Sequence, residues 1–86
     1  MKQLMNTVMI DRIRHLAADL FNLPAERISS SSSSADIRAW DSLQHLNLIL
    51  AIEQEFQIQI EPEEAERMKT ICDVAKQVEY KLASHA

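Results

Sequence analysis

The chain has 86 residues, of which 47% are hydrophobic and 26% are charged, with a formal net charge of -4 and no glycine. We expect one small folded domain over residues 1–86, too small to include a separate cofactor-binding domain. The acidic charge argues against a nucleic-acid-binding surface. The lack of glycine excludes glycine-rich phosphate-binding loops and disfavours β folds rich in hairpins.

The chain contains one cysteine, Cys72, so no internal disulfide can form. No apolar run is long enough for the core of a signal peptide or for a membrane span. We therefore expect a cytoplasmic protein. One cysteine and three dispersed histidines make a poor ligand set for zinc, so no metal site is predicted. Cys72 is expected to be a small buried residue of the last helix.

A first amphipathic helix is predicted from about Leu4 to Phe21, because apolar residues recur there at intervals of three and four. It should end near Asn22, since Pro24 disfavours helical conformation in the residue before it. The opposite face of this helix should carry solvated charges, which are Asp11, Arg12, Arg14 and Asp19.

A long first loop is predicted from Pro24 to Trp40, with an unbroken run of serines from Ser29 to Ser34. Serine side chains cannot build a core, so we expect this loop to be flexible. Ile28 and Ile37 are expected to anchor its two ends, and Trp40 to pack beside the start of the next helix. A loop of this length in a small domain is often functional.

A second helix is predicted from Ser42 to about Phe56. Asp41 and Gln44 form a capping-box pattern, in which Asp41 accepts from the first-turn amides and Gln44 reaches back. Ser42 in the first turn should face solvent, where the amides and the helix dipole favour an attached phosphate. Apolar residues cover most of the circumference, which predicts a central helix. They are Leu43, Leu46, Leu48, Ile49, Leu50, Ala51, Ile52 and Phe56.

The residues after Phe56 are predicted to form a short extended segment and two further helices. Alternation from Gln57 to Ile60 indicates an extended segment that buries two isoleucines. Pro62 should begin a short helix that ends near Met68, and Thr70 should cap a final helix. The predicted fold is therefore an all-α four-helix bundle with three longer helices and a short third one. The final helix should bury Ile71, Val74, Ala75, Val78 and Leu82.

The tripeptide Asp41-Ser42-Leu43 at the start of such a helix resembles the attachment motif of acyl carrier proteins and of the related peptidyl and D-alanyl carrier domains. The similarity runs from about Leu4 to Leu82. It implies a bundle of the acyl-carrier type in which Ser42 bears a covalent 4′-phosphopantetheine arm, derived from coenzyme A, whose thiol holds acyl or aminoacyl groups as thioesters. Further similar segments are Ala51-Ile52-Glu53, Glu55-Phe56, Pro62-Glu63-Glu64-Ala65 and Met68-Lys69-Thr70-Ile71.

The resemblance also implies a non-catalytic monomer that serves fatty acid, polyketide or nonribosomal peptide biosynthesis. Its partners would be a phosphopantetheinyl transferase, an acyl- or aminoacyl-activating ligase and downstream acyl-processing enzymes. Asp41 would lie where the transferase docks. The expected partner-binding residues are Leu43, Leu50, Glu63 and Glu64, although the leucines could instead belong to the core and the glutamates to a solvated face.

Two other functions are considered. A small helical protein-interaction module would keep the bundle without the modification. A hydrolase would use His45, on the same helical face as Ser42, as the base for a serine nucleophile. A chain of this size offers little space for an oxyanion hole and a substrate pocket, so a surface histidine near the phosphate is the simpler interpretation.

Two kinds of cargo are compatible with the pattern. A fatty chain could insert between the helices, gaining about 0.8 kcal/mol per buried methylene. A short amino acid would gain little and stay outside. The side chains that would line the inserted chain are Leu46, Ile49, Ile60, Met68 and Ile71.

Overall fold

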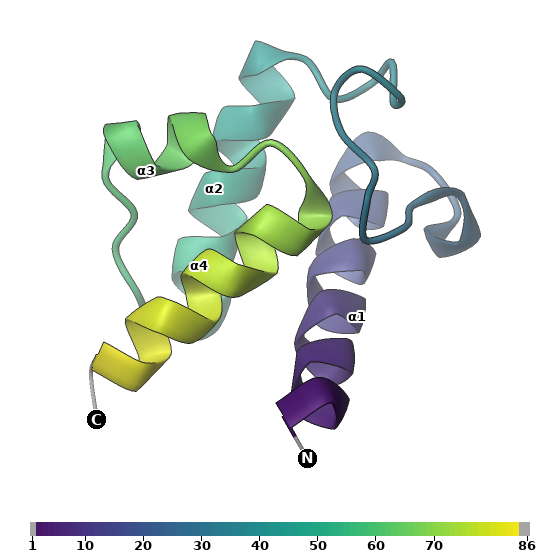
Figure 1. The fold of residues 1–86 in the computed structure, drawn as a ribbon. Coiled ribbons are helices and arrows are strands. Elements are labelled where there is room, and N and C mark those ends of the chain that lie inside the picture. The colour runs from purple at the N-terminus through teal and green to yellow at the C-terminus, as the bar shows by residue number, and fades with distance from the viewer. Residues whose placement is uncertain (1, 85–86) are drawn as a thin grey trace.

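The computed structural model describes residues 2–84, with side chains from residue 7 to residue 83. Within residues 2–84 the chain forms four α-helices and one 3-10 turn. They are α1 (Lys2–Phe21), η1 (Ala25–Arg27), α2 (Ser42–Phe56), α3 (Pro62–Arg67) and α4 (Ile71–Ser84). In Figure 1, α1 packs against α2 and α4, and the long connection between α1 and α2 folds around the C-terminal end of α1. The predicted all-α fold with a short third helix is confirmed.

The helices end where the sequence predicted, and local geometry explains why. Asn22, directly after α1, has a φ of 58°, a left-handed conformation that asparagine tolerates better than most residues. At the start of α4, the Asp73 amide donates to Thr70 Oγ1 over 3.1 Å, and the Thr70 amide donates to Asp73 Oδ2 over 3.2 Å. These two bonds satisfy amides that lack partners inside the helix.

No helix within residues 2–84 is both long and apolar enough to cross a membrane.

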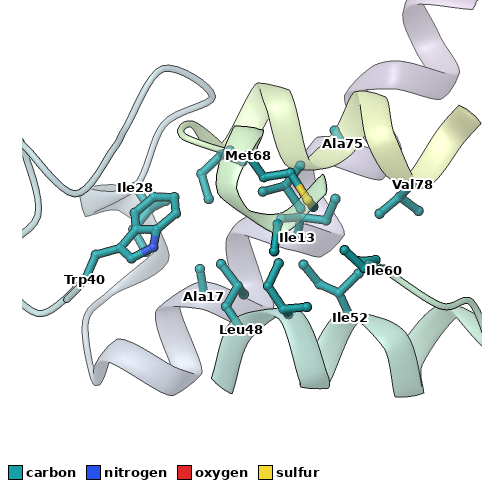
Figure 2. Close-up of a cluster of buried hydrophobic side chains, with 14 of the residues drawn as sticks. Ile13, Ala17, Ile28, Trp40, Leu48, Ile52, Ile60, Met68, Ala75 and Val78 are labelled. Carbon is teal, nitrogen blue, oxygen red and sulfur yellow. The ribbon is translucent and has the colours of Figure 1, made fainter. Parts of the chain in front are cut away.

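One hydrophobic core joins all four helices and both ends of the long loop. Ile28 and Ile37 are buried in it, as are Ile58 and Ile60 of the segment before α3, so these four predictions are confirmed. Figure 2 shows Trp40 at one end of the cluster and Val78 at the other. The side chains with less than 2% of their surface exposed are Ile13, Ile28, Leu48, Ile52, Ile71, Val74 and Val78.

The second helix is less enclosed than its apolar sequence predicted. Its buried residues are Leu48, Ile49, Ile52 and Phe56, which lie on one side of α2. Leu43, Leu46 and Leu50 are 67%, 58% and 57% exposed. The expectation that α2 is buried around most of its circumference is therefore wrong, because the rest of the bundle covers only its inner face.

The serine run is not the flexible segment that its composition predicted. Ser32 is buried, and its hydroxyl accepts a hydrogen bond from the Ser29 amide over 2.9 Å. The Ile71 amide donates to the Ser32 carbonyl over 3.2 Å, and the Cys72 amide donates to the Ser30 carbonyl over 2.8 Å. The run therefore supplies main-chain acceptors to the first turn of α4, which needs partners from outside the helix.

Three further side chains differ from their predicted surroundings. Arg14 is not a solvated charge: its guanidinium donates to the Ala25 and Ile28 carbonyls and to Asp11 Oδ1. It thereby holds the start of the long loop against α1. Cys72 is half-buried rather than buried, and Leu82 is exposed, because α4 extends past the core at its C-terminal end.

Candidate functional site

Ser42 is the first residue of α2 and its side chain is exposed, as predicted. The preceding residue, Asp41, has an extended conformation, and its Oδ1 accepts a hydrogen bond from the Gln44 amide over 2.8 Å. The cap fixes the point at which the helix begins. Ser42 is therefore presented at the positive end of the α2 dipole, where a negatively charged substituent is stabilised.

The second half of the predicted capping box is absent. Gln44 does not reach back to Asp41; its Nε2 donates to the Leu20 carbonyl over 3.0 Å. Asn47 Nδ2 in turn donates to Gln44 Oε1 over 2.9 Å. These two amides attach the first turns of α2 to the last turn of α1, so the position of Ser42 is fixed by the neighbouring helix as well as by its own cap.

His45 links Trp40 to α3. The indole N–H of Trp40 donates to His45 Nδ1 over 3.0 Å, and His45 Nε2 lies 2.8 Å from the Ala65 carbonyl oxygen. Because the indole nitrogen can only donate, Nδ1 must accept, and Nε2 carries the proton that bonds Ala65. The expectation of a simple surface histidine is wrong, since His45 is half-buried. Neither ring nitrogen is left to accept a proton from Ser42.

Trp40 is the largest side chain near the site, and only 2% of it is exposed. Its ring centroid lies 5.4 Å from that of Phe21 and 6.0 Å from the imidazole of His45. The expected packing of Trp40 beside the start of α2 is confirmed. This aromatic contact connects the end of α1, the end of the long loop and the first turn of α2.

An open cleft of about 750 Å³ lies beside Ser42. The serine run forms one wall, the first turns of α2 form another, and the end of α3 with the residues after it forms the third. Most of the accessible surface of the cleft is apolar, and hydroxyl groups and side chains of both charges lie around it. Its lining residues are Ser33, Ser34, Ala35, Trp40, Asp41, Ser42, His45, Leu46, Glu66, Met68 and Lys69.

The four predicted partner-binding residues lie in different environments. Leu43 and Leu50 are exposed and, at helical spacing, share the outer face of α2 with Leu46, which was not predicted to be a partner contact. Glu63 is exposed in the first turn of α3. Glu64 is half-buried and bonded within the chain, so only Glu63 of the pair has a carboxylate open to solvent.

Glu64 connects α3 to α4. Its Oε1 lies 2.7 Å from Lys81 Nζ and accepts a hydrogen bond from the Glu61 amide over 2.8 Å. Gln77 Nε2 donates to the other oxygen over 3.2 Å. The hydrogen bond from Lys81, followed by the one from the Glu61 amide, lowers the pKa of Glu64.

The lowered pKa of Glu64 predicts a pH-dependent contribution to stability. Because the pKa of Glu64 is lower in the folded protein than in the unfolded chain, its carboxylate stabilises the fold at pH values above the unfolded-state pKa. This contribution is lost as the pH falls through the folded-state pKa. We expect the free energy of unfolding to fall more between about pH 7 and about pH 3 in the wild type than in Lys81→Met. Urea titrations at both pH values measure this difference. An equal loss in the two proteins would contradict the role of Lys81.

Within residues 2–84, no group of three or more His, Cys, Asp and Glu side chains is arranged to hold a metal ion. Three chemical features lie near Ser42: its own exposed hydroxyl at a helix N-terminus, an adjacent cleft with apolar and polar walls, and an apolar outer face of α2.

Comparison with known proteins agrees with these features. The family described as "Phosphopantetheine attachment site" matches residues 11–78. The acyl carrier protein of Thermosynechococcus vestitus is 33% identical over 75 residues, covering 87% of this chain and 93% of that protein. The acyl carrier protein of Buchnera aphidicola subsp. Schizaphis graminum is 36% identical over 69 residues, covering 80% and 84%.

A solved structure shows the same fold. The solution structure of a holo acyl carrier protein from Geobacter metallireducens has a TM-score of 0.80 and 31% sequence identity, and the match covers 90% of this chain and 88% of that one. The chain therefore belongs to the acyl carrier protein family of phosphopantetheine-binding carriers. It is a carrier of acyl groups, and its prosthetic group is 4′-phosphopantetheine.

Proposed function

We propose that Ser42 is the residue to which the phosphopantetheine arm is attached. The observation that carries the proposal is the exposed hydroxyl on the first residue of α2. A phosphodiester formed there would be stabilised by the free amides of the first helical turn. Asp41 holds that turn in place and, in this proposal, lies within the surface where the phosphopantetheinyl transferase docks.

The residues around Ser42 suit this group. The adjacent cleft of about 750 Å³ has the size of a small-molecule site. Its serine hydroxyls can bond the amides of the arm, Lys69 can neutralise the phosphate, and Leu46 offers apolar contact. When bound, the arm supplies a thiol that holds the acyl group as a thioester. The test is the mass gained from coenzyme A in the presence of a transferase, in wild type and in Ser42→Ala.

In the proposed mechanism the chain itself catalyses nothing. It acts as a monomeric single-domain carrier in the cytoplasm, and its partners modify, load and unload it. The partners are the transferase, an acyl- or aminoacyl-activating ligase and downstream acyl-processing enzymes. Tethering confines the thioester near the partner's active site and so raises its effective concentration there.

We propose that partners dock on the outer face of α2, on the row of Leu43, Leu46 and Leu50. Three leucines that are all more than half exposed and lie at helical spacing form an apolar strip of the kind that marks interaction sites. Gln44 and Asn47 are neutral and add no charge to the strip, and their amides bond to the Leu20 carbonyl and to each other. Glu63 at the start of α3 can meet a basic residue of the partner, whereas Glu64 contributes by holding α3 in position.

Polar substitutions in this row are expected to impair modification without unfolding the protein. Leu43→Ser and Leu50→Ser should each lower kcat/KM for the transferase by roughly tenfold, since loss of a central apolar contact costs more than about 1 kcal/mol. Their free energies of unfolding should stay within about 0.5 kcal/mol of the wild type. Val8→Ser is the matched control, because Val8 is 56% exposed on α1. Equal effects at Val8 and Leu43 would argue against a specific docking face.

A further inference from the structure

The first three turns of α2 carry no charged side chain. Residues 42–52 include no aspartate, glutamate, lysine or arginine. The one titratable ring in this stretch, that of His45, has both nitrogens hydrogen-bonded within the chain. The leucine row, which consists of Leu43, Leu46 and Leu50, therefore lies in a surface that is both apolar and uncharged.

The two carboxylates of α2 follow this stretch, and both have partners within the molecule. Glu53 Oε2 accepts a hydrogen bond from the Ile60 amide over 2.7 Å. Glu55 Oε2 lies 2.7 Å from Arg12 Nη2 of α1, and the same guanidinium lies 4.7 Å from the centroid of the Phe56 ring. A cation on a partner would have to compete with these groups for either carboxylate.

The exposed charges from the first turn of α3 to residue 69 cancel. Glu63 and Glu66 are exposed, and Arg67 and Lys69 are exposed as well. Two carboxylates and two cations leave no net formal charge. Glu66 and Lys69 both line the cleft beside the attachment site, whereas Glu61, at the start of α3, lines a different cleft. The acidic charge of the chain is thus not concentrated beside the leucine row.

This distribution of charge decides what kind of groove can receive the leucine row. An apolar groove gains free energy, because the leucines and its own lining are both removed from water. A lysine or arginine of a partner placed over the row would lose its water and find no carboxylate, which is costly. A partner with basic residues in its groove is therefore disfavoured, and this mismatch contributes to specificity.

We infer, on the basis of the attachment at Ser42 and the docking on the leucine row proposed above, that the partner enzymes receive α2 in an apolar groove with no cluster of basic residues facing the helix. Shape and apolar contact govern this docking, and the net charge of -4 has little influence on it. The sign of a charge introduced into the row should not matter, because either sign is removed from water without a counterion.

A pair of charge variants at one position tests this inference. Leu50→Glu and Leu50→Lys place opposite charges at a side chain that is 57% exposed and lies about two turns from Ser42. The probe is a broad-specificity phosphopantetheinyl transferase with coenzyme A, acting on the full chain. We expect each variant to lower kcat/KM by about tenfold or more, with the two values within about twofold of each other.

Val8→Glu and Val8→Lys are the matched controls. Val8 is 56% exposed on α1, outside the leucine row, so this pair changes the net charge by the same amounts. The ratio of kcat/KM between the two Val8 variants measures the influence of net charge alone. The ratio at Leu50 should equal it within about twofold, at both about 50 mM and about 500 mM sodium chloride.

A ratio at Leu50 that favours glutamate by about fivefold or more at the lower salt, and falls toward the Val8 ratio at the higher salt, would overturn the inference. It would show that basic residues of the transferase face α2. Far-UV circular dichroism should show the helix content of the wild type in all four variants, since each changes an exposed side chain.

Failure of this inference can be distinguished from failure of the proposals on which it rests. If both Leu50 variants are modified as fast as the wild type, the leucine row is not the docking surface, which would overturn this inference as well. A mass gain retained in Ser42→Ala would contradict the attachment site alone. A dimer detected by light scattering in the wild type and absent in both Leu50 variants would show that a second copy of this chain covers the row, and would overturn the inference.

Discussion

Replacing Ser42 by alanine is expected to abolish the mass gain that the wild type shows after incubation with coenzyme A and a broad-specificity phosphopantetheinyl transferase. In the wild type, the Ser42 Oγ would form a new bond to the phosphorus next to the pantetheine, while the P–O bond of the coenzyme A pyrophosphate breaks. The adenosine bisphosphate half of coenzyme A leaves, and the hydroxyl proton is released. Alanine has no oxygen with which to form that bond. Intact-protein mass spectrometry should show one added phosphopantetheine group in the wild type and none in Ser42→Ala.

Ser34→Ala is the matched control for this experiment. Ser34 is an exposed serine that lines the same cleft, but it does not lie at a helix N-terminus. It should be modified as fully as the wild type. Both variants should retain a free energy of unfolding within about 0.5 kcal/mol of the wild type, since each removes an exposed hydroxyl. A mass gain retained in Ser42→Ala would contradict the attachment site.

Replacing Trp40 by alanine is expected to cause the largest loss of stability near the site. Truncating a buried tryptophan costs about 3–5 kcal/mol, and domains of this size are typically stable by only about 5–15 kcal/mol. The substitution also removes the contacts with Phe21 and the hydrogen bond to His45. Urea unfolding followed by far-UV circular dichroism should show a lower midpoint or a protein that is already partly unfolded in buffer.

Two further variants separate the contributions of Trp40. Trp40→Phe keeps an aromatic ring but removes the indole N–H, so most of the packing energy should remain, and a loss of about 1 kcal/mol is expected from the missing hydrogen bond. Leu50→Ala truncates an exposed side chain and should stay within about 0.5 kcal/mol of the wild type. A loss in Trp40→Ala no larger than that in Leu50→Ala would contradict the structural role of Trp40.

Local patterns in the sequence predicted the helices and the position of Ser42 correctly. Asp41 signals the start of α2 because a carboxylate before an apolar helix accepts from its free amides. Pro24 and Pro62 mark a boundary through the fixed geometry of the proline ring. These signals involve residues within one helical turn of each other, so the sequence alone contains them.

The sequence did not reveal contacts made by main-chain carbonyls of distant segments. The Gln44 side chain bonds the Leu20 carbonyl of α1, and the His45 side chain bonds the Ala65 carbonyl of α3. Every residue has a carbonyl, so no pattern of side chains indicates which one will serve as the acceptor. Arg14 was predicted to be solvated for the same reason. The one available signal was the spacing of Trp40 and His45, which brings an indole donor near an imidazole at the start of a helix.

The exposure of Leu46 could not be read from hydropathy alone. An apolar residue on a mostly apolar helix is indistinguishable in sequence from its buried neighbours, and only the arrangement of the other helices decides which face is covered. Leu43 and Leu50 were considered as partner contacts through resemblance to carrier proteins. Leu46 lies between them on the same outer face and was instead assigned to the interior.

The main-chain docking of the serine run onto α4 has a consequence for how this loop can vary. The Ser30 and Ser32 carbonyls, rather than most of the hydroxyls, hold the amides of Ile71 and Cys72. Substituting the side chain at an exposed position such as Ser31 should therefore have little effect on the contact with α4. The length of the run, in contrast, is constrained, because one inserted or deleted residue would shift the register of the acceptors, detach the first turn of α4 and reshape the wall that faces Ser42.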